Sequence, residues 1–163
     1  MAAYRFLTTW LLEARRDAVF QALWDSERWP DWWRGVESVQ TLEEGDAEGV
    51  GSLGRYVWKS RLPYRLEFDS RIIAVDRPRY MEGHATGELE GTGRWRLYAE
   101  GSLTDVTYQW EVRATAAWMS RLSPIARPVF AWNHDVVMGW GAEGIARLLR
   151  ARLIAAAWRS RRF

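Results

Sequence analysis

The feature that most constrains the fold is a long block in which apolar and polar residues alternate, from Val36 to Arg113. Side chains of a β-strand point alternately to opposite faces, so each run in this block predicts a strand with one buried face and one wet face. The runs are separated by short turns such as Glu44–Asp46 and Leu62–Pro63. Short turns indicate antiparallel pairing, because parallel strands need long crossovers. The clearest run places on one face Tyr64, Leu66, Phe68, Ser70 and Ile72.

Helical patterns flank this block. A first strand over Tyr4–Leu12 precedes a helix over Arg15–Trp24, and a second short helix follows, bent by a proline near Trp32 and Trp33. A long helix is predicted over Val129–Leu153, with its inner stripe formed by Phe130, His134, Val137, Gly141, Ile145 and Leu148. The order of elements predicts one α+β domain over residues 1–163. We interpret residues 151–163 as a basic tail, and Glu90–Gly93 as a hairpin turn.

Three glycines stand in the predicted long helix, at Gly139, Gly141 and Gly144. Each one weakens a helix by about 1 kcal/mol relative to alanine. Two explanations remain open: a close crossing of the helix over the strands, or space left free above the sheet. Aromatic residues make up 14% of the chain, including twelve tryptophans. Such rings are typical of small-molecule sites, so we predict an apolar cavity between sheet and helix.

Several stretches resemble the START-like helix-grip superfamily, also called SRPBCC, in its polyketide cyclase/dehydrase and lipid-transport branch. They are Ala18–Trp24 with Glu27–Trp33, then Glu90–Leu97, and finally Arg127–Asp135. The similarity extends from about Tyr4 to Arg150. It implies a seven-stranded antiparallel sheet wrapped around the long helix, with a deep cavity between them.

The superfamily contains carriers of lipids and hormones, aromatase/cyclases and hydroxylating oxygenase domains, so the resemblance implies the fold more than the chemistry. The oxygenase branch requires an iron–sulfur domain and a metal triad, which a chain without cysteine and with two histidines does not supply. We expect a small hydrophobic ligand, lipid-, polyketide- or aromatic-like, to contact Trp33, Tyr56, Trp58, Phe68, Tyr108, Trp110, Asn133, Val137 and Gly141.

His134 is the candidate catalytic residue, because a histidine on the inner stripe can exchange protons with a carbonyl ligand near neutral pH. The alternative, which we favour, is a structural histidine whose two ring nitrogens are bonded to protein groups. Three functions therefore remain open: a binding protein for a hydrophobic ligand, a polyketide cyclase or dehydratase that uses His134, and a protein-interaction or stress-response module with a vestigial cavity.

No cofactor fingerprint and no metal-binding spacing is visible, and we expect neither a cofactor nor a metal. The second histidine, His84, lies on a predicted strand whose orientation the neighbouring glycines leave open.

The basic charge is confined to one end of the chain. Six arginines follow Glu143, with no acidic residue among them, and without them acidic residues outnumber basic ones. We therefore expect no nucleic-acid partner, and at most a weak contact of the arginine-rich end with a membrane surface. The longest late apolar run, Leu153–Trp158, is too short to cross a bilayer. The start of the chain lacks the apolar stretch of a signal peptide, so a cytoplasmic location is expected.

Overall fold

The computed structural model describes residues 3–115, 117 and 123–162, and within them eight strands form one antiparallel sheet. The elements follow the order β1 (Ala3–Leu12), α1 (Arg16–Trp24), η1 (Ser26–Arg28), α2 (Trp29–Trp32), β2 (Val36–Glu43), β3 (Leu53–Lys59), β4 (Arg65–Asp76), β5 (Tyr80–Gly87), β6 (Leu89–Glu100), β7 (Leu103–Ala114), α4 (Ser123–Leu149) and β8 (Leu153–Arg162).

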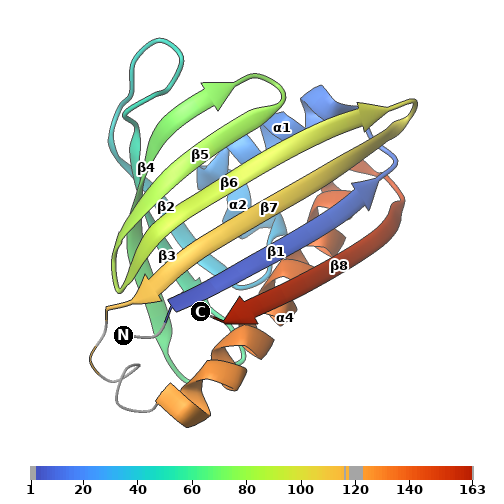
Figure 1. The fold of residues 1–163 in the computed structure, drawn as a ribbon. Coiled ribbons are helices and arrows are strands. Elements are labelled where there is room, and N and C mark those ends of the chain that lie inside the picture. The colour runs from blue at the N-terminus through green and yellow to red at the C-terminus, as the bar shows by residue number, and fades with distance from the viewer. Residues whose placement is uncertain (1–2, 116, 118–122, 163) are drawn as a thin grey trace.

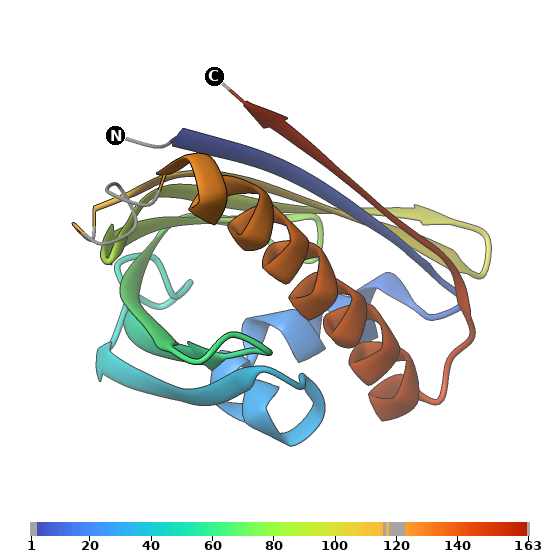
Figure 2. The ribbon, with the colours of Figure 1, turned by 90° about the horizontal axis from the view of Figure 1, so that it is seen from below.

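Strands β2 to β7 follow one another across the sheet, β1 lies beside β7, and β8 forms the outer edge beyond β1. The sheet curves around α4, while α1 and α2 cover one end of its concave face (Figures 1 and 2). Register places Tyr56 opposite Phe68, and Phe6 opposite Trp110. The prediction of an α+β fold with an antiparallel sheet wrapped on a long helix is confirmed.

The predicted strand number was wrong by one, because the supposed basic tail at residues 151–163 contains β8. This strand pairs with β1 along its length, as in Thr8 opposite Trp158. Helix α4 ends at Leu149, earlier than predicted, and Arg150 adopts a left-handed conformation with a φ of 51°. The Ala151 N–H then bonds to the Ala146 carbonyl at 2.9 Å, which closes the helix end. Glycine usually marks such an end, and here an arginine takes its place.

The segment Glu90–Gly93, predicted as a turn, belongs instead to β6. Its glycines are needed because β7 comes very close. A Cβ atom on Gly91 would lie 1.9 Å from the carbonyl oxygen of Glu111, and one on Gly93 would lie 2.7 Å from the Tyr108 hydroxyl. A glycine inside a strand often marks such a close approach and not a reversal of the chain.

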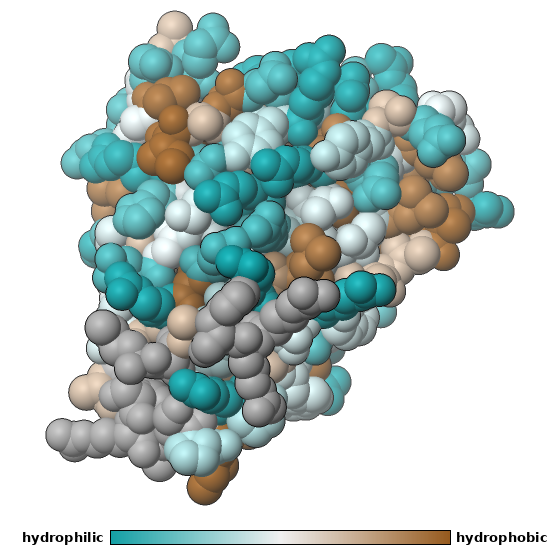
Figure 3. Space-filling view, viewed as in Figure 1, coloured by the Kyte–Doolittle hydropathy of each residue, from teal (hydrophilic) through white to brown (hydrophobic). Residues whose placement is uncertain are grey.

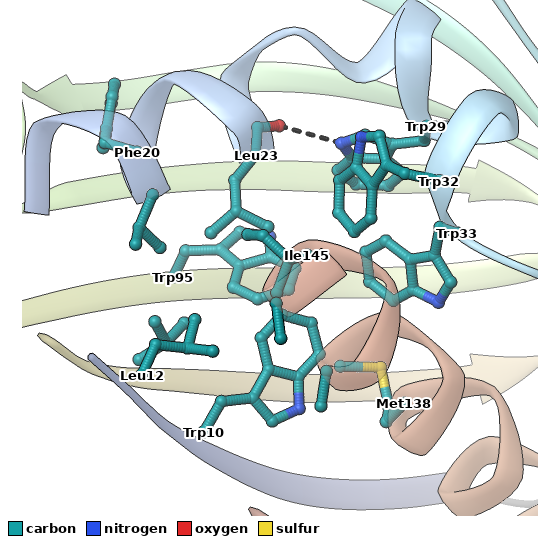
Figure 4. Packing of buried hydrophobic residues seen from close by; sticks show 14 of the residues in the cluster. Trp10, Leu12, Phe20, Leu23, Trp29, Trp32, Trp33, Trp95, Met138 and Ile145 are labelled. Atoms are coloured by element: carbon teal, nitrogen blue, oxygen red, sulfur yellow. Dashed lines mark hydrogen bonds between the residues drawn. The ribbon is translucent and has the colours of Figure 1, made fainter. Parts of the chain in front are cut away.

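Two of the three glycines of α4 are explained by α2 and by Trp33, the residue that follows it. A Cβ on Gly141 would lie 2.5 Å from Cε2 of Trp33, and one on Gly144 would lie 2.0 Å from the carbonyl oxygen of Trp32. The long helix therefore makes its close contact with α2. The two explanations offered from the sequence were a crossing over the strands and free space above the sheet, and neither of them named α2. Figure 4 shows Trp32 and Trp33 above this helix, in a core that also contains Trp10. None of the described helices is long and apolar enough to cross a membrane.

Candidate ligand-binding cavity

A cavity of about 720 Å³ lies between the concave face of the sheet and α4. Its walls come from the inner positions of β3, β4, β6 and β7, from the inner face of α4, and from α2. This volume is in the range of small-molecule sites, which hold most of a ligand's surface against apolar and aromatic side chains.

The sheet wall is a continuous row of aromatic rings. Trp95 stacks on Tyr108 with 4.1 Å between ring centroids, and Tyr56 stacks on Phe68 at 5.7 Å. Trp110 joins the two pairs, because its ring lies 5.6 Å from that of Phe68 and 5.9 Å from that of Tyr108. Each stacked pair is formed by directly opposite residues of two adjacent strands, β3 with β4 and β6 with β7. The contact of Trp110 with Phe68 instead reaches across β5 and β6 on the concave face of the sheet.

Helix α2 supplies the wall at one end of the cavity. The Trp33 indole N–H donates a hydrogen bond of 2.8 Å to the carbonyl oxygen of Val137 on α4. The ring of Trp33 meets that of Trp58 at an interplanar angle of 89°, and Trp29 packs against it with 4.9 Å between centroids. The Trp33 side chain is therefore fixed by one hydrogen bond and by rings on two sides.

His134 lies on the inner face of α4, stacked on Phe6 with 4.0 Å between ring centroids. Among the described residues, neither ring nitrogen has a hydrogen-bond partner. The nearest charged atom is Oδ1 of Asp135, 3.8 Å from Nδ1, which is too long for a hydrogen bond. The expectation of a structural histidine with both nitrogens bonded to protein groups is therefore wrong.

Burial lowers the pKa of His134, because removal from water disfavours the imidazolium, and the nearby Asp135 carboxylate opposes this shift only in part. The imidazole is thus neutral at physiological pH, with one nitrogen able to donate a hydrogen bond and the other able to accept one. This protonation state is the one that a general base requires.

Other polar groups line the cavity. The Trp58 indole nitrogen and the Asn133 side-chain oxygen are buried without a hydrogen-bond partner in the described part of the chain. Burial raises the pKa of Tyr108 well above its usual value of 10.0, and burial also raises that of Tyr56, whose hydroxyl bonds to the Ser26 hydroxyl at 3.1 Å. Both phenols therefore stay protonated. The cavity presents donors and acceptors at a few points of an otherwise apolar wall.

The end of the cavity nearest to solvent is polar. Exposed side chains from the α1–η1 segment and the β2–β3 loop complete the lining there, including Glu27 and Glu44. Arg77 lies over the ring of Trp24, 4.1 Å from its centroid, and also belongs to this rim. The Glu27 carboxylate accepts a hydrogen bond of 2.9 Å from the backbone N–H of Thr41 on the edge strand β2. This hydrogen bond fixes the Glu27 part of the rim to the edge strand of the sheet.

The structure brings nearly all of the expected site residues together. Those on the cavity wall are Trp33, Tyr56, Trp58, Phe68, Tyr108, Trp110, Asn133, His134 and Val137. Gly141 does not line the cavity, because the Trp33 ring covers it, and its assignment as a ligand contact was wrong. Leu148, assigned to the inner stripe, is 44% exposed.

The expected ligand contacts left out several wall residues, namely Trp29, Trp95 and Met138, and also Phe130, which had been placed on the inner stripe of the long helix. The alternation in β6 could have placed Trp95, since it pairs directly with Tyr108. His84 is exposed and lies outside this cavity, beside a small hollow that also contains Arg5 and Glu111. In the ranges that the structure describes, no cluster of three histidine, aspartate or glutamate side chains could hold a metal ion.

The fold and its cavity define a protein of the START-like helix-grip class. The sequence matches the family model for polyketide cyclase / dehydrase and lipid transport over residues 12–134, and the chain belongs to this family. No curated protein matches the sequence.

Three similar solved structures support the fold. The Zhui aromatase/cyclase from a Streptomyces species is 18% identical with a TM-score of 0.75, over 90% of this chain and 94% of that one. A START superfamily protein from Mycobacterium smegmatis is 12% identical with a TM-score of 0.73, over 90% and 97%. A protein from Thermus thermophilus is 15% identical with a TM-score of 0.71, over 88% and 98%.

Proposed function

We propose that the protein binds a hydrophobic, ring-bearing small molecule in the cavity beneath α4. The observation that carries this proposal is the row of aromatic rings lining a space of about 720 Å³. Flat rings stack well on such a wall, and the polar groups at Trp58, Asn133 and Tyr108 can orient a few oxygen atoms of the ligand. An acyl chain would fill the same volume but would leave these polar groups without partners, which is unfavourable in a buried site.

The test is saturable binding of the neutral fluorescent probe phenylnaphthylamine to the folded protein. Ser70 is half-buried on β4 and lines the cavity, whereas Ser38 on β2 is exposed and does not. Ser70→Phe places a ring inside the cavity and is expected to weaken probe binding at least tenfold, about 1.4 kcal/mol. Ser38→Phe makes the same chemical change on a strand outside the cavity and is expected to leave binding unchanged. Equal affinities for the two variants would contradict the proposal.

A second function is favoured by one specific observation, the neutral His134 with both nitrogens unbonded among the described residues. We infer that this imidazole can act as the acid and base of a polyketide cyclase or dehydratase. It would take a proton from the carbon beside a ligand carbonyl and then return it to the neighbouring hydroxyl group as that group leaves as water. The imidazole is regenerated, and the products are the conjugated ketone and one water molecule.

A β-hydroxy-tetralone tests this second function, because loss of water converts it into a fluorescent naphthol. His134→Gln is expected to abolish naphthol formation while leaving phenylnaphthylamine affinity within about twofold, since glutamine cannot exchange protons near neutral pH. His84→Gln, at the exposed histidine, is the matched control and should keep the full rate. If the unmodified protein binds the probe and forms no naphthol, the catalytic proposal fails and the binding proposal stands.

A further inference from the structure

The outer face of α4 is apolar as well as its inner face. Ile125, Val129 and Trp132 are 74%, 39% and 47% exposed, and their spacing places them on one side of the helix. The opposite side carries the buried Phe130 and the cavity residue Val137. A surface helix normally has a polar outer face, and one that is apolar all round is usually covered on every side. The outer side of α4 therefore has the character of a contact surface.

Strand β8 extends this apolar side. Figures 1 and 2 show β8 running beside α4 at the edge of the sheet, and Figure 3 shows, on the face seen in Figure 1, groups of hydrophobic residues at the upper left and toward the right edge. Gly139 follows Trp132 by seven residues and lies on the same side of the helix. A Cβ atom on Gly139 would meet the Trp158 ring at 3.7 Å, and Trp158 is itself 42% exposed. We call the set Ile125, Val129, Trp132 and Trp158 the α4–β8 surface.

Unpaired positive charge accompanies this surface. Arg147, on the outer side of α4, and Arg150, just after its last turn, are both exposed, and neither forms an ion pair within the described ranges. By contrast, several arginines on the convex face of the sheet are paired, as Arg55 is with Asp69 at 2.8 Å. One carboxylate, that of Glu143, lies one turn after Gly139 on the outer side of α4, and no acidic residue follows it in the chain. The charge of this region is therefore net positive.

We propose that the α4–β8 surface docks on a bilayer that contains anionic lipids. Tryptophan rings are favoured at the boundary between headgroups and acyl chains, and arginines near that boundary are attracted by anionic headgroups. A second copy of the chain fits less well, because a two-fold contact through this surface would bring net positive regions together. The inner face of α4 lines the cavity, so docking would place the ligand site one helix diameter, about 10 Å, from the membrane.

Flotation with lipid vesicles tests this proposal, with no ligand added, so its result is independent of the proposed ligand binding. The protein is expected to float with vesicles of phosphatidylcholine and phosphatidylglycerol at low salt, and not with phosphatidylcholine alone. Trp132→Ser should weaken binding roughly tenfold, because about half of a large ring no longer enters the interface. Arg147→Gln should weaken it about fivefold, and this difference should shrink at high salt.

Two variants serve as matched controls. Tyr98→Ser removes an aromatic ring that is 58% exposed on β6, and Arg15→Gln removes one positive charge before α1. Both should float like the unmodified protein, and retained phenylnaphthylamine binding would show that each variant is folded. Failure of the unmodified protein to float, or equal losses in the control variants, would overturn the proposal. A dimer that dissociates on Trp132→Ser, without flotation, would identify a second copy as the partner.

Discussion

Replacing Gly141 by alanine is expected to destabilise the protein, although alanine is the better helix former. The added Cβ would lie 2.5 Å from Cε2 of Trp33, well inside van der Waals contact. Trp33 cannot yield easily, because its side chain is 1% exposed and its indole N–H is bonded to the Val137 carbonyl. The substitution therefore forces either the indole or the helix away from its position.

The expected magnitude follows from three contributions. Removing a glycine from a helix interior stabilises the fold by about 1 kcal/mol. Overpacking a filled core destabilises it by about 1–3 kcal/mol. Losing the hydrogen bond from Trp33 to Val137 removes about 1 kcal/mol more. The net change for Gly141→Ala is a loss of about 2 kcal/mol in the free energy of unfolding.

Gly139→Ala is the matched control, because it lies in the same helix two residues earlier. Its added Cβ would meet only ring atoms of Trp158, the nearest at 3.7 Å, which is an ordinary contact. The higher helix propensity of alanine is then almost the only effect, so the free energy of unfolding of this variant should rise by up to about 1 kcal/mol. The two alanine variants are thus expected to change the unfolding free energy in opposite directions.

Urea unfolding followed by far-ultraviolet circular dichroism measures both values in one experiment. If Gly141→Ala were as stable as Gly139→Ala, Trp33 could not be seated against α4, and the arrangement of α2 over the helix would be wrong. Phenylnaphthylamine affinity gives a second readout, because Trp33 is a cavity wall residue. Displacing its ring should weaken probe binding in Gly141→Ala and leave it unchanged in Gly139→Ala.

Two further changes address the polar groups of the cavity. Because burial lowers the pKa of His134 below the ordinary 6.5, unfolding takes up a proton as pH falls through that value, so stability should decrease there. His134→Gln should remove this loss, relative to His84→Gln, in urea midpoints measured from about pH 8 to pH 5. Gly93→Ala brings a Cβ within 2.7 Å of the Tyr108 hydroxyl and should lower stability by about 1–3 kcal/mol. Thermal unfolding checks the Gly93 variant, and a neutral result would place Tyr108 elsewhere.

The cavity wall was largely predictable because a strand's alternation fixes which side chains share a face. Tyr56, Phe68 and Tyr108 could be assigned to one wall before their strands were paired. Gly141 was misassigned for the complementary reason. Gly141 does lie on the inner stripe of the helix, as predicted. The ring that covers it belongs to Trp33, which follows α2 and is distant in sequence, so the helical pattern could not reveal it.

The environment of His134 was also beyond the sequence. Its position on the inner face of α4 follows from helical spacing, and the structure places it at the cavity. Whether its nitrogens are bonded depends on what lies opposite, and there the ring stacks on Phe6 from β1. An apolar ring offers no hydrogen bond, so burial and not pairing governs the pKa of this histidine.

Local pattern alone determined the class of fold, the antiparallel pairing and most of the cavity wall, because these depend on periodicity along the chain. Tertiary structure decided the remainder. The segment after Leu149 became β8 because the chain turns back at Arg150 and meets the free edge of β1, a partner nearly the whole chain away. A segment of alanines and arginines has no strong local preference for a strand, so its structure depends on the edge that receives it.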